Sequence, residues 1–192
     1  MEGTTGEKIN PSPIERRREL KQAMSSLANA GTHCGSCSGV CCTFLANSMQ
    51  ITPVEAVDLR EWLISQNRWN EDLLLSLKTC VKRFRLDQEL GDGRRSLRRT
   101  YTCPFYLDGP QGCSISRDHK PYGCLAFNPR IPDQTEGGNC CSDQKQLEIR
   151  DQNFPTEATQ NEHLRQIHHL PYAKAPLPII LLDLEKSSRL DP

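Results

Sequence analysis

Cysteine is concentrated in two stretches of this 192-residue chain, and this clustering constrains the fold more than any other feature. The first block holds Cys34, Cys37, Cys41 and Cys42, and the second holds Cys103, Cys113, Cys124, Cys140 and Cys141. Small residues fill the gaps of the first block, so its backbone can turn tightly around a bound group. Thiols gathered in this way predict either a metal centre or a disulfide framework.

A metal centre is the favoured interpretation. Two cysteines separated by two residues, as Cys34 and Cys37 are, bring both sulfurs within reach of one ion at about 2.3 Å. Cys41 adds a third sulfur from the same turn, and a loop of the second block would close the shell. Because the two blocks are remote in sequence, metal binding would be coupled to folding. Disulfides are disfavoured, since no apolar signal segment is found at the N-terminus and a cytoplasmic location would keep the thiols reduced.

The number of centres stays open. Neighbouring side chains in extended backbone point in different directions, so Cys41–Cys42 and Cys140–Cys141 each hold either one ligand and a bystander, or ligands of two centres. Either Cys140 or Cys141 could be the late ligand. The tenth cysteine, Cys80, lies on the apolar stripe of an expected helix and is interpreted as a core residue.

The identity of the ion also stays open, because a thiolate set suits zinc and iron–sulfur centres alike. The spacing differs from the ferredoxin pattern in which two residues separate each of the first three cysteines. His33 and His119 lie near the blocks and are candidate ligands, with a solvated loop as the simpler interpretation. His163, His168 and His169 are expected on the surface of a helix.

The order of these cysteines resembles the YkgJ-type cysteine-cluster family, described as a zinc- or iron-chelating domain. The likeness covers residues 31–142 and rests on the first block, on Cys103-Pro104-Phe105, on Gly112-Cys113-Ser114-Ile115 and on Lys120-Pro121 followed by Cys124. Lys120, Leu125 and Ser116 replace the arginine, arginine and tyrosine usual in that family. The resemblance implies that the cysteines of both blocks chelate metal. It assigns no reaction, so an iron–sulfur redox or methylation-related enzyme and a zinc-stapled protein-interaction module remain alternatives.

Charge and hydropathy argue against two classes of partner, nucleic acid and membrane. Lys plus Arg and Asp plus Glu both number 24, so the net charge is zero and a globally basic nucleic-acid binder is excluded. The locally basic stretch 82–99 also contains acids and is interpreted as a solvated face. The longest apolar run, 177–182, is interrupted by Pro178 and is far shorter than the roughly 20 residues that span a bilayer. A metal ion is therefore the expected partner, with a protein partner left open.

The periodicity predicts an α+β fold, a small irregular metal-centred domain with several helices and short strands or hairpins. Helices are expected over 14–30, 52–66, 70–90 and 156–170, extended chain over 43–51 and 94–101, and a hairpin over 107–115. The tail from Pro171 is expected to be a short strand or docking arm. The organisation expected is an N-terminal polar arm and helix (1–30), a cysteine-cluster metal-binding domain (31–142), and a C-terminal helix and tail (143–192) packing on that domain.

Overall fold

The computed structural model describes residues 39–88, 98–107, 112–125, 127–129, 140–142 and 157–189, together with Arg18, Gln22, Asn29 and Glu148. The expected helix 14–30, His33, Cys34 and Cys37 lie outside the continuous described ranges. For 127–129 and 140–142 only the backbone is described.

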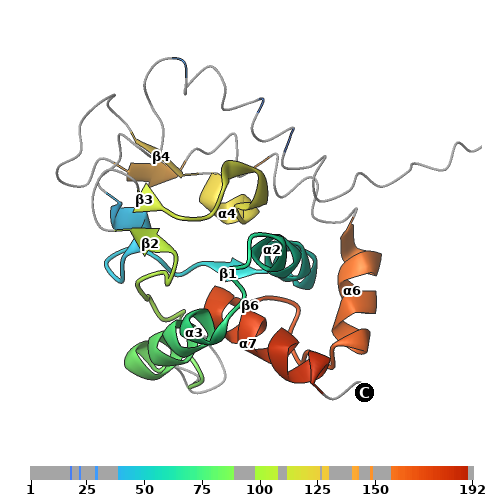
Figure 1. Ribbon diagram of the computed structural model, residues 1–192. Coiled ribbons are helices and arrows are strands. Elements are labelled where there is room, and N and C mark those ends of the chain that lie inside the picture. Colours follow the sequence, from blue (N-terminus) through green and yellow to red (C-terminus); the bar gives the residue numbers. More distant parts are fainter. Residues whose placement is uncertain are drawn as a thin grey trace, which may run out of the picture.

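The described residues form helices and short antiparallel strands, so the α+β expectation holds at this level (Figure 1). The helices are α2 (Pro53–Ser65), α3 (Glu71–Phe84), α4 (Tyr122–Leu125), α6 (Ala158–Ile167) and α7 (Leu177–Ser188), with 3-10 turns η2 (Val40–Cys42) and η3 (Arg117–His119). The strands are β1 (Gln50–Ile51), β2 (Tyr106–Leu107), β3 (Gly112–Cys113), β4 (Phe127–Pro129), β5 (Cys140–Ser142) and β6 (Ala175–Pro176). They pair as β1–β6, β2–β3 and β4–β5.

Helix α2 begins where the sequence predicts. Thr52 and Glu55 form a reciprocal cap: Thr52 Oγ1 accepts from the Glu55 N–H at 3.3 Å, and Glu55 Oε2 accepts from the Thr52 N–H at 2.8 Å. Pro53 occupies the first turn, where its missing N–H costs no helical bond. Both capping side chains are buried, so the start of α2 is fixed in place directly after β1.

Helix α3 also begins as predicted, with Asn70 Oδ1 accepting from the Leu73 N–H at 3.0 Å and acids in the first turn. Its end differs from the expectation of a helix to residue 90. The helix ends at Phe84 because Arg85 takes a left-handed conformation, with φ of 53°. This turn folds Leu86 back into a small apolar cluster with Cys80 and Tyr101.

The expectation for the C-terminal tail is wrong. Residues 177–188 form helix α7 rather than a strand or arm. Pro178, which interrupts the apolar run in the sequence, lies in the first turn, where proline neither removes a helical hydrogen bond nor clashes with a preceding turn. The short extended piece before it, β6, pairs antiparallel with β1.

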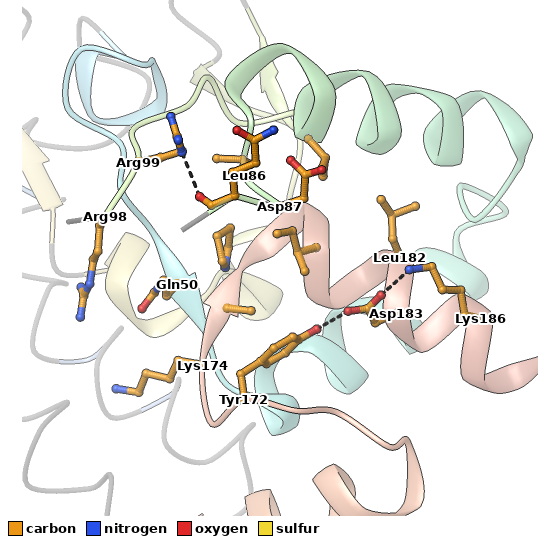
Figure 2. Close-up of a pocket in the computed structure, with 15 residues that line it drawn as sticks. Gln50, Leu86, Asp87, Arg98, Arg99, Tyr172, Lys174, Leu182, Asp183 and Lys186 are labelled. Atoms are coloured by element: carbon orange, nitrogen blue, oxygen red, sulfur yellow. Dashed lines mark hydrogen bonds and ion pairs between the residues drawn. The ribbon is translucent and has the colours of Figure 1, made fainter. Parts of the chain in front are cut away.

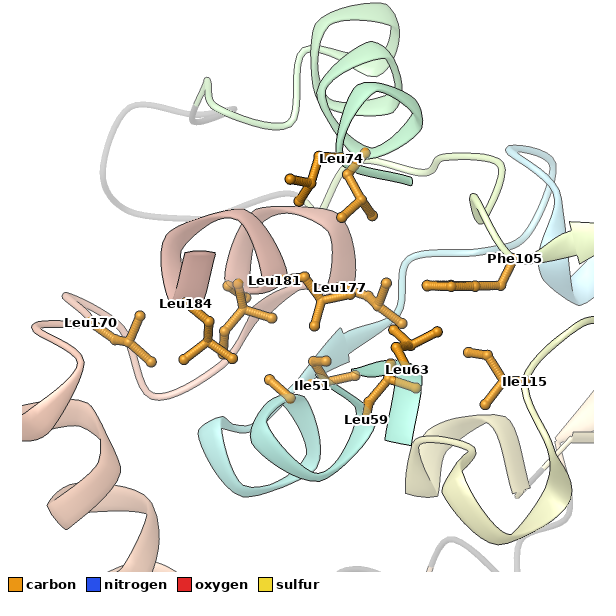
Figure 3. Close-up of a cluster of buried hydrophobic side chains, with 14 residues drawn as sticks. Ile51, Leu59, Leu63, Leu74, Phe105, Ile115, Leu170, Leu177, Leu181 and Leu184 are labelled. Carbon is orange, nitrogen blue, oxygen red and sulfur yellow. The ribbon is translucent and has the colours of Figure 1, made fainter. Parts of the chain in front are cut away.

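Helix α7 supplies the centre of the apolar core (Figure 3). Leu177, Leu181 and Leu184 lie between Leu74 of α3 and Leu59 of α2, and α7 contacts both of those helices. None of the described helices is long and apolar enough to cross a bilayer.

The core separates two regions of the molecule. In Figure 1, β2, β3, β4 and α4 lie on one side of β1 and α2, while α3 and α7 lie on the other. Every described cysteine except Cys80 belongs to the first region or to η2 beside it. The short strands and turns of that region therefore carry the candidate site, and the helices support it.

Candidate metal centre

The two cysteine blocks meet through their backbones. The Cys103 N–H donates to the Cys42 carbonyl at 2.8 Å, and the Phe44 N–H donates to Thr102 Oγ1 at 3.2 Å. Asn47 and Tyr101 extend the junction. The Tyr101 N–H donates to the Asn47 carbonyl at 2.9 Å, and the side-chain amide of Asn47 donates to the Tyr101 carbonyl at 2.9 Å. Residues remote in sequence are thus held side by side by hydrogen bonds that do not depend on sulfur.

Tyr101 anchors this junction to the core. Its ring is 1% exposed, its hydroxyl donates to the Met49 carbonyl at 2.8 Å, and it accepts from the Leu177 N–H at 3.3 Å. Burial raises the pKa of Tyr101 well above its ordinary value, so the hydroxyl keeps the proton that it donates. One side chain therefore joins the segment before Cys103 to Met49, just before β1, and to the start of α7.

The first block is shaped by a glycine. Gly39 precedes η2 with φ of +72°, a left-handed conformation that a side chain disfavours. A Cβ at this position would lie 2.6 Å from Cε2 of Tyr106, so the ring covers the glycine at contact distance. Both observations indicate that only glycine suits the turn that presents Cys41 and Cys42.

Gly39→Ala is expected to destabilise the protein by about 1–2 kcal/mol, from left-handed strain and from the Tyr106 contact. Urea unfolding followed by circular dichroism measures the change. In a Tyr106→Ala background the same substitution should cost less, because only the backbone strain remains. Unchanged stability of Gly39→Ala in both backgrounds would contradict this account of the turn.

Cys41 and Cys42 share η2, and their sulfurs are 4.0 Å apart. In a tetrahedral site with bonds of about 2.3 Å, two thiolates lie about 3.8 Å apart. The 3-10 turn brings neighbouring side chains closer than extended backbone does. This spacing leaves room for both sulfurs at one ion, so Cys41 and Cys42 need not divide between two centres.

Cys103 and Cys113 lie at the base of one hairpin. The Tyr106 N–H donates to the Cys103 carbonyl at 3.0 Å, and Tyr106 faces Cys113 in the β2–β3 register. The hairpin is tied to the end of α2 by Arg68, whose guanidinium donates to Ser114 O at 2.7 Å and to Ser114 Oγ at 2.8 Å. The hairpin expected over 107–115 is confirmed, with its strands shifted to 106–107 and 112–113.

Cys124 comes from α4, a short helix that is not among the helices expected from the sequence. Gly123 lies so close to Met49 that a Cβ would be 2.7 Å from its sulfur, which seats α4 against the residue before β1. After α4, strand β4 pairs with β5, opposing Asn128 to Cys141 and Pro129 to Cys140. Strand β5 contacts η2, so the last two cysteines belong to the same region at the level of the backbone.

Electrostatics show that several of these sulfurs are near one another. Burial raises the pKa of the Cys103 thiol far above its ordinary value; a hydrogen bond from Phe105 opposes the rise, and the Cys113 and Cys42 thiols add to it. Burial also raises the pKa of Cys124, and Cys103 and Cys113 again add to the rise. Without a cation these thiols are neutral, whereas a coordinated metal ion deprotonates a thiol outright.

The described cysteines are neighbours rather than a formed coordination shell. In the part of the chain that the structure describes, no group of three or more His, Cys, Asp or Glu side chains is arranged to hold a metal ion. No disulfide joins any two of the six cysteines whose side chains the structure describes. The donor type and its partly buried setting fit zinc or iron–sulfur chemistry. Cys34 and Cys37, the two cysteines that the sequence separates by two residues, lie outside the described residues.

Cys80 lies in another apolar cluster, although its thiol also adds to the rise in the pKa of Cys103. Cys80 is 7% exposed in the cluster with Leu86 and Tyr101, its thiol donates to Thr102 O at 3.4 Å, and burial raises its pKa to about 11. His119 stacks on Trp62 and faces Asp58 at 3.4 Å, so it is partly enclosed rather than a solvated loop residue. His163 on α6 and His169 just after it are exposed, as expected, whereas His168 is half-buried and its Nδ1 lies 3.2 Å from Ser187 Oγ.

Comparisons with protein-family models, with curated proteins and with solved structures found no match for this chain. The functional interpretation therefore rests on the residues and contacts described above.

Proposed function

We propose that this protein binds zinc or iron through the thiolates of its two cysteine blocks. The observation that carries the proposal is the hydrogen bond from the Cys103 N–H to the Cys42 carbonyl, because it brings the two blocks together. Cys42, Cys103, Cys113 and Cys124 are the ligands that the described contacts support best. Cys34, Cys37, Cys41, Cys140 and Cys141 complete the candidate set.

The backbone contacts support the proposal because they gather the cysteine-bearing segments in one region. Hydrogen bonds hold Cys42 beside Cys103, the β2–β3 hairpin positions Cys113, and the packing of Gly123 on Met49 positions Cys124. Protein loops that lack a large core of their own gain rigidity when a metal links them. A bound ion would supply that link here, since it would join η2, the hairpin, α4 and β5 at one point.

The proposal extends to membership of the YkgJ-type family, whose order of cysteines the chain shares. It also places the protein in the cytoplasm, because thiolate ligands must stay reduced to bind metal. No reaction is assigned, since a thiolate site can be structural, metal-handling or redox-active.

Metal analysis of the full chain tests the proposal. Protein purified without oxygen is expected to contain zinc or iron by elemental analysis. Visible absorption that is bleached by a reductant would identify an iron–sulfur centre, whereas a colourless protein that contains zinc would identify a zinc site. Reduced, full-length protein with no more metal than an unrelated protein taken through the same purification would overturn the proposal.

A further inference from the structure

Glu55 makes a second contact besides capping α2. Its Oε2 accepts from the Thr52 N–H within the cap, and its Oε1 accepts from the Tyr122 N–H at 2.7 Å. Tyr122 is the first residue of α4 and lies 67 residues further along the chain. The cap needs only one acceptor oxygen, and glutamine serves it as well as glutamate does. The second oxygen of Glu55 is therefore free to join the first turn of α2 to the first turn of α4.

The Glu55 carboxylate is enclosed together with its donors. Glu55 is 5% exposed and Tyr122 is 3% exposed. Burying a carboxylate is costly unless hydrogen bonds satisfy its oxygens, and N–H groups that donate to a charged acceptor form stronger bonds than those that donate to a neutral one. Since the two oxygens of Glu55 accept from two different segments, the rigid plane of the carboxylate fixes these segments relative to one another.

Helix α4 depends on tertiary contacts for its position. It is four residues long, and a helix of one turn has little stability of its own. The Tyr122 N–H is held by Glu55, and the Tyr122 hydroxyl donates to Glu157 Oε1 at 3.0 Å, at the start of α6. On another side, Gly123 packs against Met49. Of these contacts, the one with Glu55 has a charged acceptor and holds the backbone of α4 itself.

We infer that Glu55 is the positioning residue of Cys124, because it holds the first turn of the helix whose third residue is this cysteine. The significance for metal rests on the proposed function, in which Cys124 is a ligand. The placement of α4 can be measured in metal-free protein. A capping motif in the sequence predicts only the contact of Glu55 with Thr52, so the contact with α4 is a finding of the structure.

Alkylation of the reduced, metal-free chain tests the placement of α4. Iodoacetamide labelling followed by peptide mass spectrometry gives the reaction rates of Cys124 and of Cys80, which lies in another apolar cluster and reports opening of the core. Glu55→Gln leaves one acceptor oxygen for two N–H groups. The ratio of the Cys124 rate to the Cys80 rate is expected to rise by about tenfold or more, because α4 loses a charge-assisted hydrogen bond. Glu55→Ala, which removes both acceptors, should raise the ratio at least as much.

Two variants serve as matched controls. Thr52→Ala removes the other half of the α2 cap but leaves the contact of Glu55 with Tyr122. Asp183→Asn makes the same change from carboxylate to amide at a group that accepts from the Tyr172 hydroxyl and the Lys186 ammonium, each at 2.7 Å (Figure 2). Both controls are expected to keep the parental ratio of labelling rates. An unchanged ratio in both Glu55 variants, or an equal rise in Thr52→Ala, would overturn the inference.

Cobalt(II) titration of the same proteins tests the part that concerns metal. Cobalt(II) is a coloured substitute for zinc, and its near-ultraviolet absorption grows with the number of thiolates bound to it. Glu55→Gln is expected to weaken cobalt binding by about tenfold and to lower this absorption, as for residues that orient metal ligands elsewhere. Asp183→Asn should bind cobalt as the parent does. Equal affinity and equal absorption in Glu55→Gln and the parent would contradict the inference.

The two measurements keep a failure of this inference distinct from a failure of the proposed function. A parent chain that binds no cobalt and is purified without metal would contradict the proposed function, and the labelling ratio alone would then decide whether Glu55 positions Cys124. A parent that binds cobalt, together with Glu55 variants that label and bind as the parent does, would leave the metal proposal standing and remove Glu55 from it.

Discussion

Cys103→Ala should remove bound metal and lower the free energy of unfolding by several kcal/mol, on the order of the large coupling between metal and folding seen in small zinc domains. Cys103 lies where the two blocks meet, and its thiol is near those of Cys113 and Cys42. Loss of the Cys103 thiolate would leave the proposed metal ion with an incomplete set of ligands. Elemental analysis and urea unfolding of the same preparations measure both effects.

Cys80→Ala is the matched control, because it removes the same atom from a buried cysteine in the apolar cluster. It is expected to cost about 1 kcal/mol through lost packing and to leave metal content unchanged. After a chelator removes the metal, the free energies of unfolding of the two variants should differ from that of the metal-free parent by similar amounts. Full metal retention in Cys103→Ala would refute this ligand assignment, and metal loss in Cys80→Ala would move Cys80 into the shell.

Leu181→Ala is expected to destabilise the protein by about 3 kcal/mol, within the range measured for large-to-small changes in cores. Leu181 is 0% exposed and lies on α7 between α2 and α3, where removal of its side chain leaves a cavity that three helices border. Urea unfolding with circular dichroism detection gives the change in free energy.

Leu75→Ala provides the comparison, since Leu75 is 64% exposed on α3 and the same atoms are removed from a surface position. Its effect should stay within about 0.5 kcal/mol. If the two leucine variants were equally stable, α7 would not hold the central place in the core that the structure gives it.

Local signals in the sequence predict the starts of α2 and α3 well. Thr52 with Glu55, and Asn70 with the acids that follow it, satisfy the first N–H groups of α2 and α3 by hydrogen bonds that need no tertiary contact. The same reasoning fails at helix ends and in the tail. The end of α3 depends on the left-handed Arg85, and α7 depends on burial against two other helices.

The extended chain expected over 43–51 is wrong in its first part, for a related reason. Residues 43–46 form a turn, and only Gln50 and Ile51 pair as a strand. The turn is held by hydrogen bonds such as that from the Asn47 N–H to Thr43 O at 2.8 Å, and by contacts with residues 101–102. A periodicity argument contains no information on such remote partners.

In the candidate site, too, some residues can be predicted from the sequence and others cannot. Spacing alone nominates the cysteines, because the reach of two sulfurs to one ion is a local property. Gly39, Tyr101 and Arg68 carry no sequence motif, although they shape the turn, anchor the junction and tie down the hairpin.

The hydroxyl oxygen of Tyr101 accepts a hydrogen bond from the first N–H of α7, and Tyr101 itself lies in the segment that leads into Cys103. The carboxyl-terminal helix is thus a structural foundation for the sulfur-rich half of the protein. A shortened chain that stops before Leu177 would lose the central leucines of the core. It would also lose one of the two hydrogen-bond partners of the Tyr101 hydroxyl. The region that would bind metal cannot be isolated by trimming the molecule from its far end.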